Sequence, residues 1–362
     1  MATTNYAALT SEQKKVWARD IWKAARDYMF LNRFLGEGQT AMIQRISELT
    51  KTEKGDQAII TLVADLEGDG VAGDRTLEGN EEAGKSYDQK IRIDQLRHAV
   101  RHEGRMAEQK SVVTFREHAR DTLAYWLADR TDQMGFLTLS GVSYAFNTDG
   151  TARVGSDLAN LEFNADVTAP STNRHRRWDA STGLGAGDTT AVAAEDKPTY
   201  DMLVEMKAYA KNNFIKPLRG EGGMELYNVF MTPDGVAKLK QDSKFHQAWR
   251  DAMPRTKDNP LFKGADVIYV DGLAIYEYRH VYHADTWGAG SNVKGQRVLL
   301  CGAQAMGYAD IGDPEWVEKG FDYDNQQGIS TGKIMGYKKP VFRSQVTKTN
   351  EDFGVLVVDT AR

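Results

Sequence analysis

The chain has 362 residues and a net charge of −5, and 41% of its residues are hydrophobic. This length supports one large core or two or three smaller ones. The acidic balance argues against a dedicated nucleic-acid binder, and the single cysteine, Cys301, excludes an intrachain disulfide framework. The sequence contains neither a run of about 18 apolar residues nor an apolar N-terminal signal, so we expect a soluble protein without a membrane span.

The first predicted element is a helix that begins after Thr10, with Gln13 completing a capping box. Its broad apolar face carries two tryptophans, Trp17 and Trp22. The spacing favours a helix docked on the core of its own chain. The alternative is an arm that lies on a neighbouring copy, so Trp17 and Trp22 are candidate inter-subunit contacts.

A two-stranded ribbon is predicted next, because residues 58–64 and 87–95 both have strand-like patterns. The segment between them is rich in glycine and acids and is too long for a tight turn. Such a ribbon is marginally stable alone, and its acidic tip would gain order on a basic surface of another copy. A solvated mobile loop is the alternative. The acidic candidates for contact are Asp65, Glu67, Asp69, Asp74, Glu78, Glu81 and Glu82, and the basic candidates are Arg97, Arg101 and Arg105.

Residues 105–140 have the apolar spacing of one long helix, which would span roughly 45 Å. The predicted buried stripe includes Phe115, Leu123, Leu127 and Leu137. Charged residues fill much of the opposite face: Arg116, Glu117, Arg120, Asp121, Asp129 and Asp132.

The remainder divides into two parts. Residues 141–197 are rich in glycine, asparagine and threonine and predict an inserted loop or small subdomain. This range contains a basic cluster from Arg174 to Arg177, which we expect to pair with acids at the surface; contact with phosphate is the alternative. Residues 198–309 predict an α+β unit, in which Thr232-Pro233-Asp234 begins a helix and Asp271-Gly272 closes a hairpin. The run 355–359 is apolar enough for an interior strand.

Two segments match the sequence patterns of catalytic motifs, but their surrounding residues do not suit the chemistry of those motifs. Gly79–Ser86 fits the phosphate-binding loop pattern, yet three glutamates crowd it and a strand rather than a helix follows. Gly328–Gly332 fits the nucleophile elbow, yet no histidine follows His283 to serve as its base.

The metal-binding patterns are also weak. His98 and His102 have a spacing that can share a metal on a helix, but no third ligand is evident. The acidic run that begins at Asp65 resembles a calcium loop, but its twelfth position is Thr76 instead of glutamate. The sequence therefore predicts no enzyme, no metal and no cofactor.

Five stretches of the chain resemble the major capsid protein of N-four-like tailed phages. They are VWARDIWKAARDYMFLNRF (16–34), TLEGNEE (76–82), IDQLRHAVRHEGRMAEQ (93–109), WLADRTDQ (126–133) and DFGVLVVDTA (352–361). The resemblance implies an α+β fold of the Hong Kong 97 capsid type. Its implied parts are an N-terminal arm (1–50), an extended loop (51–104), a peripheral domain with a spine helix (105–140 and 310–362), an insertion (141–197) and an axial domain (198–309).

The resemblance further implies a subunit that self-assembles as pentamers and hexamers into the icosahedral head of a tailed phage, around double-stranded DNA. The implied partners are other copies, a separate scaffolding protein, a portal, decoration proteins and weakly bound DNA. The implied location is the virion capsid, and the host cytoplasm during assembly. Two alternatives remain open: an encapsulin-like nanocompartment shell with the same fold, and a P-loop NTPase through Gly79–Ser86.

Overall fold

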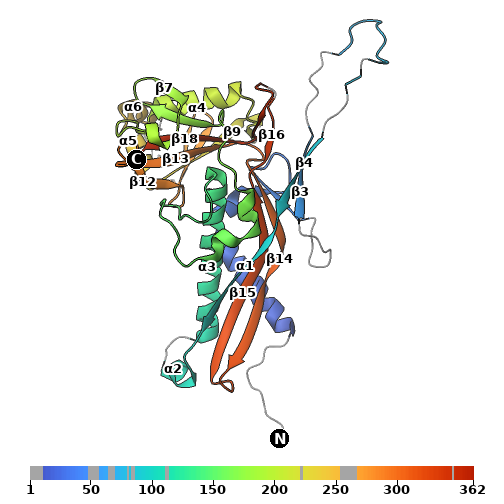
Figure 1. Cartoon of the computed structure of the whole chain (residues 1–362), viewed down its shortest axis with the longest axis vertical. Helices are drawn as coiled ribbons and strands as arrows, with labels where there is room; N and C mark the ends of the chain where they lie inside the picture. Colours follow the sequence, from blue (N-terminus) through green and yellow to red (C-terminus); the bar gives the residue numbers. More distant parts are fainter. Residues whose placement is uncertain are drawn as a thin grey trace.

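The computed structural model describes residues 11–47, 57–63, 70–79, 81–82, 86–110, 114–220, 223–252, 267–344 and 346–362. Figure 1 shows an elongated molecule with two main parts. A nine-stranded sheet with its helices forms one end, and a five-stranded sheet beside a long helix forms the other. A two-stranded ribbon projects next to the junction between them.

The five-stranded sheet is built around a long antiparallel hairpin. Its strands in order are β1 (Leu35–Gly36), β2 (Ile43–Ile46), β14 (Met306–Phe321), β15 (Gln326–Lys338) and β5 (Asp94–Arg101). Pairing of β14 with β15 extends from Gly307↔Lys338 to Phe321↔Gln326. The sequence predicts only the apolar stretch 334–337 of this hairpin, because the outer half of β14 alternates buried residues with charged exposed ones.

The predicted helix 105–140 is two helices, α2 (Arg105–Lys110) and α3 (Phe115–Ser140). Thr114 has an extended backbone, so α3 does not continue from α2. The predicted apolar stripe is otherwise confirmed, since Leu123, Leu127 and Leu137 are fully buried. At its C-terminal end α3 is buried all round, and Gly141 closes it in the left-handed conformation.

Helix α1 (Ser11–Tyr28) and the short helix η1 (Leu31–Phe34) cross α3 and β14. Ile21, Trp22 and Ala25 are buried in the same core as the apolar face of α3. The described part of this N-terminal arm therefore docks on its own chain. Trp17 lies on α1, but its side chain lies outside the described residues.

The nine-stranded sheet orders its strands as β10 (Val267–Val270), β11 (Leu273–Glu277), β9 (Glu225–Met231), β13 (Val293–Cys301), β18 (Val355–Ala361), β6 (His175–Asp179) and β7 (Gly183–Ala186). Strand β12 (His283–Trp287) pairs with β13, and β8 (Leu218–Arg219) pairs with β9. The helices of this part are α4 (Tyr200–Asn212), α5 (Pro233–Gln241) and α6 (Ser243–Ala252).

Local signals place these elements as predicted. The Thr232 hydroxyl accepts the Gly235 N–H at the start of α5. Asp271 and Gly272 both have positive φ, 46° and 75°, which is the geometry of a two-residue type I′ hairpin turn.

The sheet crosses the boundaries expected from the resemblance. Strands β6 and β7 come from the expected insertion, and β18 comes from the expected peripheral range. β18 pairs with β13 of the range 198–309, β6 pairs with β18, and β7 pairs with β6, so all three belong to the same nine-stranded sheet. Every residue of β18 is buried. Strands β13 and β6 pair with its two edges, and its alternating side chains enter two different hydrophobic cores, with Val357 in one and Leu356 in the other. Two strands of the range 141–197 therefore extend the nine-stranded sheet.

The smaller elements complete the description. β3 (Gln57–Val63) pairs antiparallel with β4 (Ser86–Arg92), as predicted for the ribbon, and β16 (Val341–Arg343) pairs with β17 (Asn350–Asp352). The short helices are η2 (Asp157–Asn160), η3 (Glu162–Asp166) and η4 (Thr189–Ala191).

Candidate assembly surfaces

We define the acidic ribbon as β3, β4 and the described residues 70–79, 81 and 82 between them. Asp74, Glu78, Glu81 and Glu82 are all exposed on it. The Glu81 carboxylate accepts the Gly79 N–H at 2.7 Å, which leaves the charge facing solvent. Asp65, Glu67 and Asp69 lie outside the described residues. The ribbon thus presents a row of carboxylates away from the body of the molecule.

We define the basic edge as Arg97, Arg101 and Arg105. Arg97 and Arg101 lie on β5, the outermost strand of the five-stranded sheet, and Arg105 begins α2. All three are exposed. Within the described residues none of them forms an ion pair, although the Arg101 guanidinium lies 4.8 Å from the centre of the Phe321 ring.

These two surfaces lie far apart on one subunit. Figure 1 places residues 70–79 at the upper end of the molecule, while β5 leads down to α2 at the lower end. The complementary charges therefore do not contact each other within one subunit.

The N-terminal arm is anchored by Asp132 of α3. Its carboxylate accepts the Phe30 and Leu31 N–H groups, at 2.8 and 3.1 Å, and the Tyr278 hydroxyl at 2.7 Å. Burial raises the pKa of Asp132, although these three hydrogen bonds oppose the rise. The sequence prediction of an exposed Asp132 is wrong. Its place on the buried series Ala124, Ala128, Phe136 and Ser140, at intervals of four, was the available signal.

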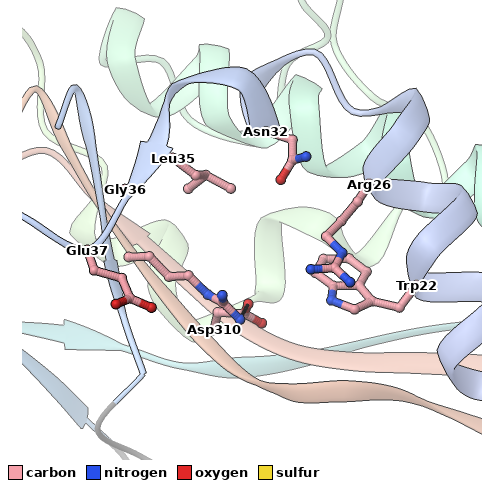
Figure 2. Close-up of a pocket in the computed structure, with 8 residues that line it drawn as sticks. Trp22, Arg26, Asn32, Leu35, Gly36, Glu37 and Asp310 are labelled. Atoms are coloured by element: carbon pink, nitrogen blue, oxygen red, sulfur yellow. Dashed lines mark ion pairs between the residues drawn. The ribbon is translucent and has the colours of Figure 1, made fainter.

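A second group of contacts holds the N-terminal arm at Trp22, which is 4% exposed. The Lys333 ammonium lies 3.3 Å from the centre of the Trp22 ring and 2.5 Å from Asp310 Oδ1, and Arg45 pairs with the other Asp310 oxygen at 2.6 Å. Burial lowers the pKa of Lys333 to about 8. The adjoining pocket has a volume of 230 Å³, and Trp22, Arg26 and Asp310 line it together with the turn after η1 (Figure 2). Because Trp22 is used within its own chain, it is not among the contacts we propose.

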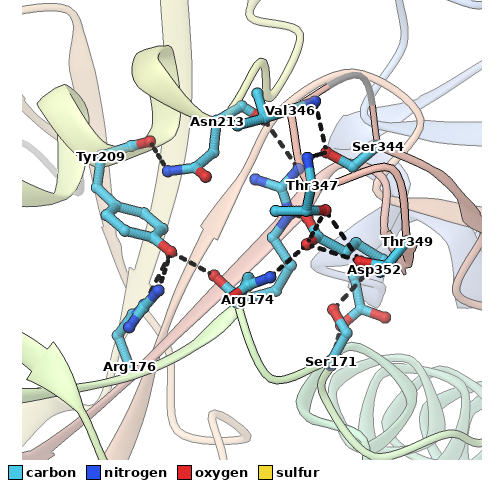
Figure 3. Close-up of polar contacts among 12 residues, drawn as sticks. Ser171, Arg174, Arg176, Tyr209, Asn213, Ser344, Val346, Thr347, Thr349 and Asp352 are labelled. Carbon is cyan, nitrogen blue, oxygen red and sulfur yellow. Dashed lines mark hydrogen bonds and ion pairs between the residues drawn. The ribbon is translucent and has the colours of Figure 1, made fainter.

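The basic cluster 174–177 pairs with acids through three of its residues, Arg174, His175 and Arg177. Arg174 is buried and the other members are half-buried, so the expected surface position is wrong for Arg174. Arg174 is 3% exposed and pairs with Glu351 at 3.3 Å. His175 contacts Asp359 at 2.6 Å. Figure 3 shows Arg176 below Tyr209 of α4, whose hydroxyl it contacts, and Arg174 nearer to the turn that precedes β17. The cluster therefore joins the helix layer of the nine-stranded sheet to the β16–β17 hairpin.

The letter-matched motifs lack the structure that their chemistry needs. Gly79 lies in an exposed turn, and Ser86 begins strand β4 instead of a helix. Ser330 is an internal residue of β15, paired with Ala99 of β5. The described residues of the two segments therefore lack the helix that follows a phosphate loop and the strand-to-helix turn of a nucleophile elbow.

The two histidines have structural contacts. His98 stacks on Trp126 with ring centres 4.6 Å apart, and His102 accepts the Gln327 N–H at 3.0 Å. Among the described residues, no group of three or more His, Cys, Asp or Glu is placed to hold a metal ion. None of the helices in the described ranges is long and apolar enough to cross a bilayer.

Comparison with known proteins gives a consistent result. A family model described as "Phage capsid protein" matches residues 3–362. The chain is 53% identical to the "Major capsid protein" of Pseudomonas phage KPP25, over 99% of this chain and 97% of that protein. The capsid of Ralstonia phage GP4 has 26% identity and a TM-score of 0.75, covering 92% of this chain and 90% of that one. The capsid of Cyanophage Pam1, at 19% identity, has a TM-score of 0.70 over 100% and 96% of the two chains and shows the shared fold.

The spine helix, the projecting ribbon and the two sheets are those of a Hong Kong 97-type capsid subunit. The chain belongs to the phage capsid protein family. It is a major capsid protein of a tailed phage, a structural component of the virion head. The nanocompartment alternative receives no support from these relatives.

Proposed function

We propose that copies of this chain close an icosahedral head of pentamers and hexamers by laying the acidic ribbon of one subunit across the basic edge of the next. The observation that carries the proposal is that four exposed carboxylates lie on the projecting ribbon, while three exposed guanidinium groups lie on β5 and α2, apart from the tip of the ribbon. Complementary charge fixes the register of two surfaces and suppresses wrong pairings.

The individual contacts are weak and the lattice is strong. An exposed ion pair contributes about 0.2–1 kcal/mol. In a closed lattice every subunit repeats the same contacts, so small energies add over many interfaces. The ribbon strands also bury little surface of their own, with a small cluster of Ile60, Ile91 and Ala309 at their base. A neighbouring copy would therefore supply much of the order of the tip.

The test is a charge reversal at the tip, Glu78→Lys with Glu81→Lys. We expect a folded subunit that no longer forms shells, measured by electron microscopy and sedimentation. A matched control reverses two exposed acids elsewhere, Glu195→Lys with Glu277→Lys, and should assemble normally. Normal shells from the tip variant would overturn the ribbon contact.

A compensating variant makes the test directional. Arg97→Glu with Arg105→Glu should also block assembly. Mixing this variant with the Glu78→Lys, Glu81→Lys variant should restore part of the shell yield, because each protein then offers one surface that complements the other. Restoration requires both proteins in the same particle, which differential isotope labelling detects.

We further propose that the head encloses double-stranded DNA and that assembly takes place in the host cytoplasm with a separate scaffolding protein, a portal and decoration proteins. A subunit with a net charge of −5 should touch DNA weakly and without sequence preference. Nuclease-protected DNA in purified particles supports this proposal, whereas a uniform protein cargo without DNA would contradict it.

A further inference from the structure

The turn between β14 and β15 has a strained backbone. Asp322, Tyr323 and Asp324 have φ of 51°, 51° and 65°, three consecutive non-glycine residues in the left-handed region. Aspartate tolerates this region, but a bulky residue such as tyrosine rarely adopts it. The Tyr323 side chain is 104% exposed, so no contact within the subunit compensates for the strain.

The turn is nevertheless held firmly. The Asn325 N–H donates to the Asp322 carbonyl at 2.9 Å, and the Gln326 side chain donates to the Glu103 carbonyl at 2.8 Å. Strand pairing continues up to Phe321↔Gln326, directly at the turn. These bonds fix the turn against the start of α2 at the lower end of the molecule (Figure 1), so Tyr323 is presented on a rigid support.

A surface that could bind a tyrosine and two carboxylates lies beside the same β14–β15 turn. The Phe321 ring is flanked by the Arg101 guanidinium at 4.8 Å and by the Lys319 ammonium at 5.1 Å, and both cations are exposed. We call these three side chains the cationic platform. Asp322 and Asp324, on either side of Tyr323, are exposed and form no ion pair with a described residue.

We propose that Tyr323 of one copy packs on the cationic platform of a neighbouring copy, with Asp322 and Asp324 facing its Arg101 and Lys319. The proposal rests on the assembly proposed above only in requiring that copies meet. The occupant is a second copy because the tyrosine with its two carboxylates and the receptor with its two cations are carried by one tip. A knob and a receptor on the same tip give a head-to-tail contact, which closes into a ring when the rotation between copies closes.

Substitutions at position 323 separate a contact role from a turn-forming role. Tyr323→Gly relieves the left-handed strain, so the subunit should be at least as stable to urea as the parent. Loss of a buried aromatic anchor should nevertheless raise the subunit concentration needed for assembly by about tenfold or more. Tyr323→Phe keeps the ring and should assemble close to the parent level. Assembly of the glycine variant at the parent concentration would overturn the proposal.

A direct readout identifies the partner. A photo-reactive benzoyl-phenylalanine at position 323, in shells grown from a mixture of normal and heavy-isotope subunits, should give mixed-isotope cross-links to the segment that carries Lys319 and Phe321. Cross-links confined to one copy, or to another region of the neighbour, would contradict the proposed contact.

The outcomes distinguish the contact at the β14–β15 turn, called the tip contact here, from the contact made by the acidic ribbon. If Tyr323→Gly assembles normally while the Glu78→Lys, Glu81→Lys variant does not, the tip contact alone is wrong. If the ribbon variant assembles and mixed-isotope cross-links form at the tip, the ribbon contact alone is wrong.

Discussion

Lys333 carries a charge inside the protein, where an ammonium is costly unless it is paired. Asp310 pairs with it, the Gly312 carbonyl accepts a further hydrogen bond at 3.2 Å, and the Trp22 ring covers it. Arg45 competes for the same carboxylate, and Asp313 adds a weaker attraction. Burial still disfavours the ammonium relative to that of a free lysine, so the pKa of Lys333 falls from 10.5 to about 8.

This pKa shift predicts how stability changes with pH. Above pH 8 the folded protein releases the Lys333 proton, while the unfolded chain holds it up to its ordinary pKa of 10.5. The unfolded state then binds more protons, so this group makes the free energy of unfolding rise between pH 8 and 10.5, by up to about 3 kcal/mol. Urea unfolding of the unassembled subunit at several pH values measures it. Lys333→Met should lack this rise, and identical pH profiles for the two proteins would disprove the assignment.

Single-residue sites were hard to predict because their chemistry depends on distant partners. The helical pattern predicts an exposed Asp132, yet its carboxylate accepts hydrogen bonds from Phe30, Leu31 and Tyr278. No local sequence pattern connects these residues to Asp132. Lys333 was hidden for the same reason, since Trp22 and Arg45 come from the other end of the chain. The exposed charges of the ribbon and of β5 were predictable because charge density is visible without knowing the partner.

At the scale of elements, α3 and the N-terminal arm approach each other at Gly135. A Cβ at this glycine would overlap the Leu31 side chain. Alanine usually stabilises a helix by about 1 kcal/mol relative to glycine, but here Gly135→Ala should destabilise the subunit, because overpacking a core costs about 1–3 kcal/mol.

The comparison is with Thr122→Ala on an exposed turn of the same helix. This substitution should be neutral or stabilising by a few tenths of a kcal/mol, up to about 0.7 kcal/mol, because alanine has the higher helix propensity. Thermal unfolding of both variants measures the difference. A Gly135→Ala subunit more stable than the parent would show that the arm does not pack as described.

Elements with local signals were predicted and those without them were not. Capping at Thr199 and Thr232 and the Asp271-Gly272 turn are specified by neighbouring residues, so they follow from sequence. The β14–β15 hairpin has exposed charges and glycines along its outer half, which weaken a strand pattern. The break before α3 also lacks a proline or glycine signal at Thr114.

For the whole molecule, charge-driven contact predicts a dependence on salt. Raising sodium chloride from 0.1 to 1 M shortens the screening length from about 10 Å to about 3 Å. The exposed ribbon and basic edge should then attract less, and the subunit concentration needed for assembly should rise. Light scattering during assembly measures this change. Apolar contacts do not weaken with salt, so unchanged or stronger assembly in high salt would point to an apolar interface instead.

The pairing of chain segments has a consequence for timing. Strand β2 pairs with β14 through Ile43↔Met306, and β5 pairs with β15 through Arg97↔Gly332. Contacts between such distant segments form slowly, because the entropy cost of closing a long loop must be met before the contacts stabilise the chain. Strand β5, which carries Arg97 and Arg101, therefore cannot pair with β15 until β15 has been synthesised. Folding of the whole subunit therefore comes before the ordered display of this surface.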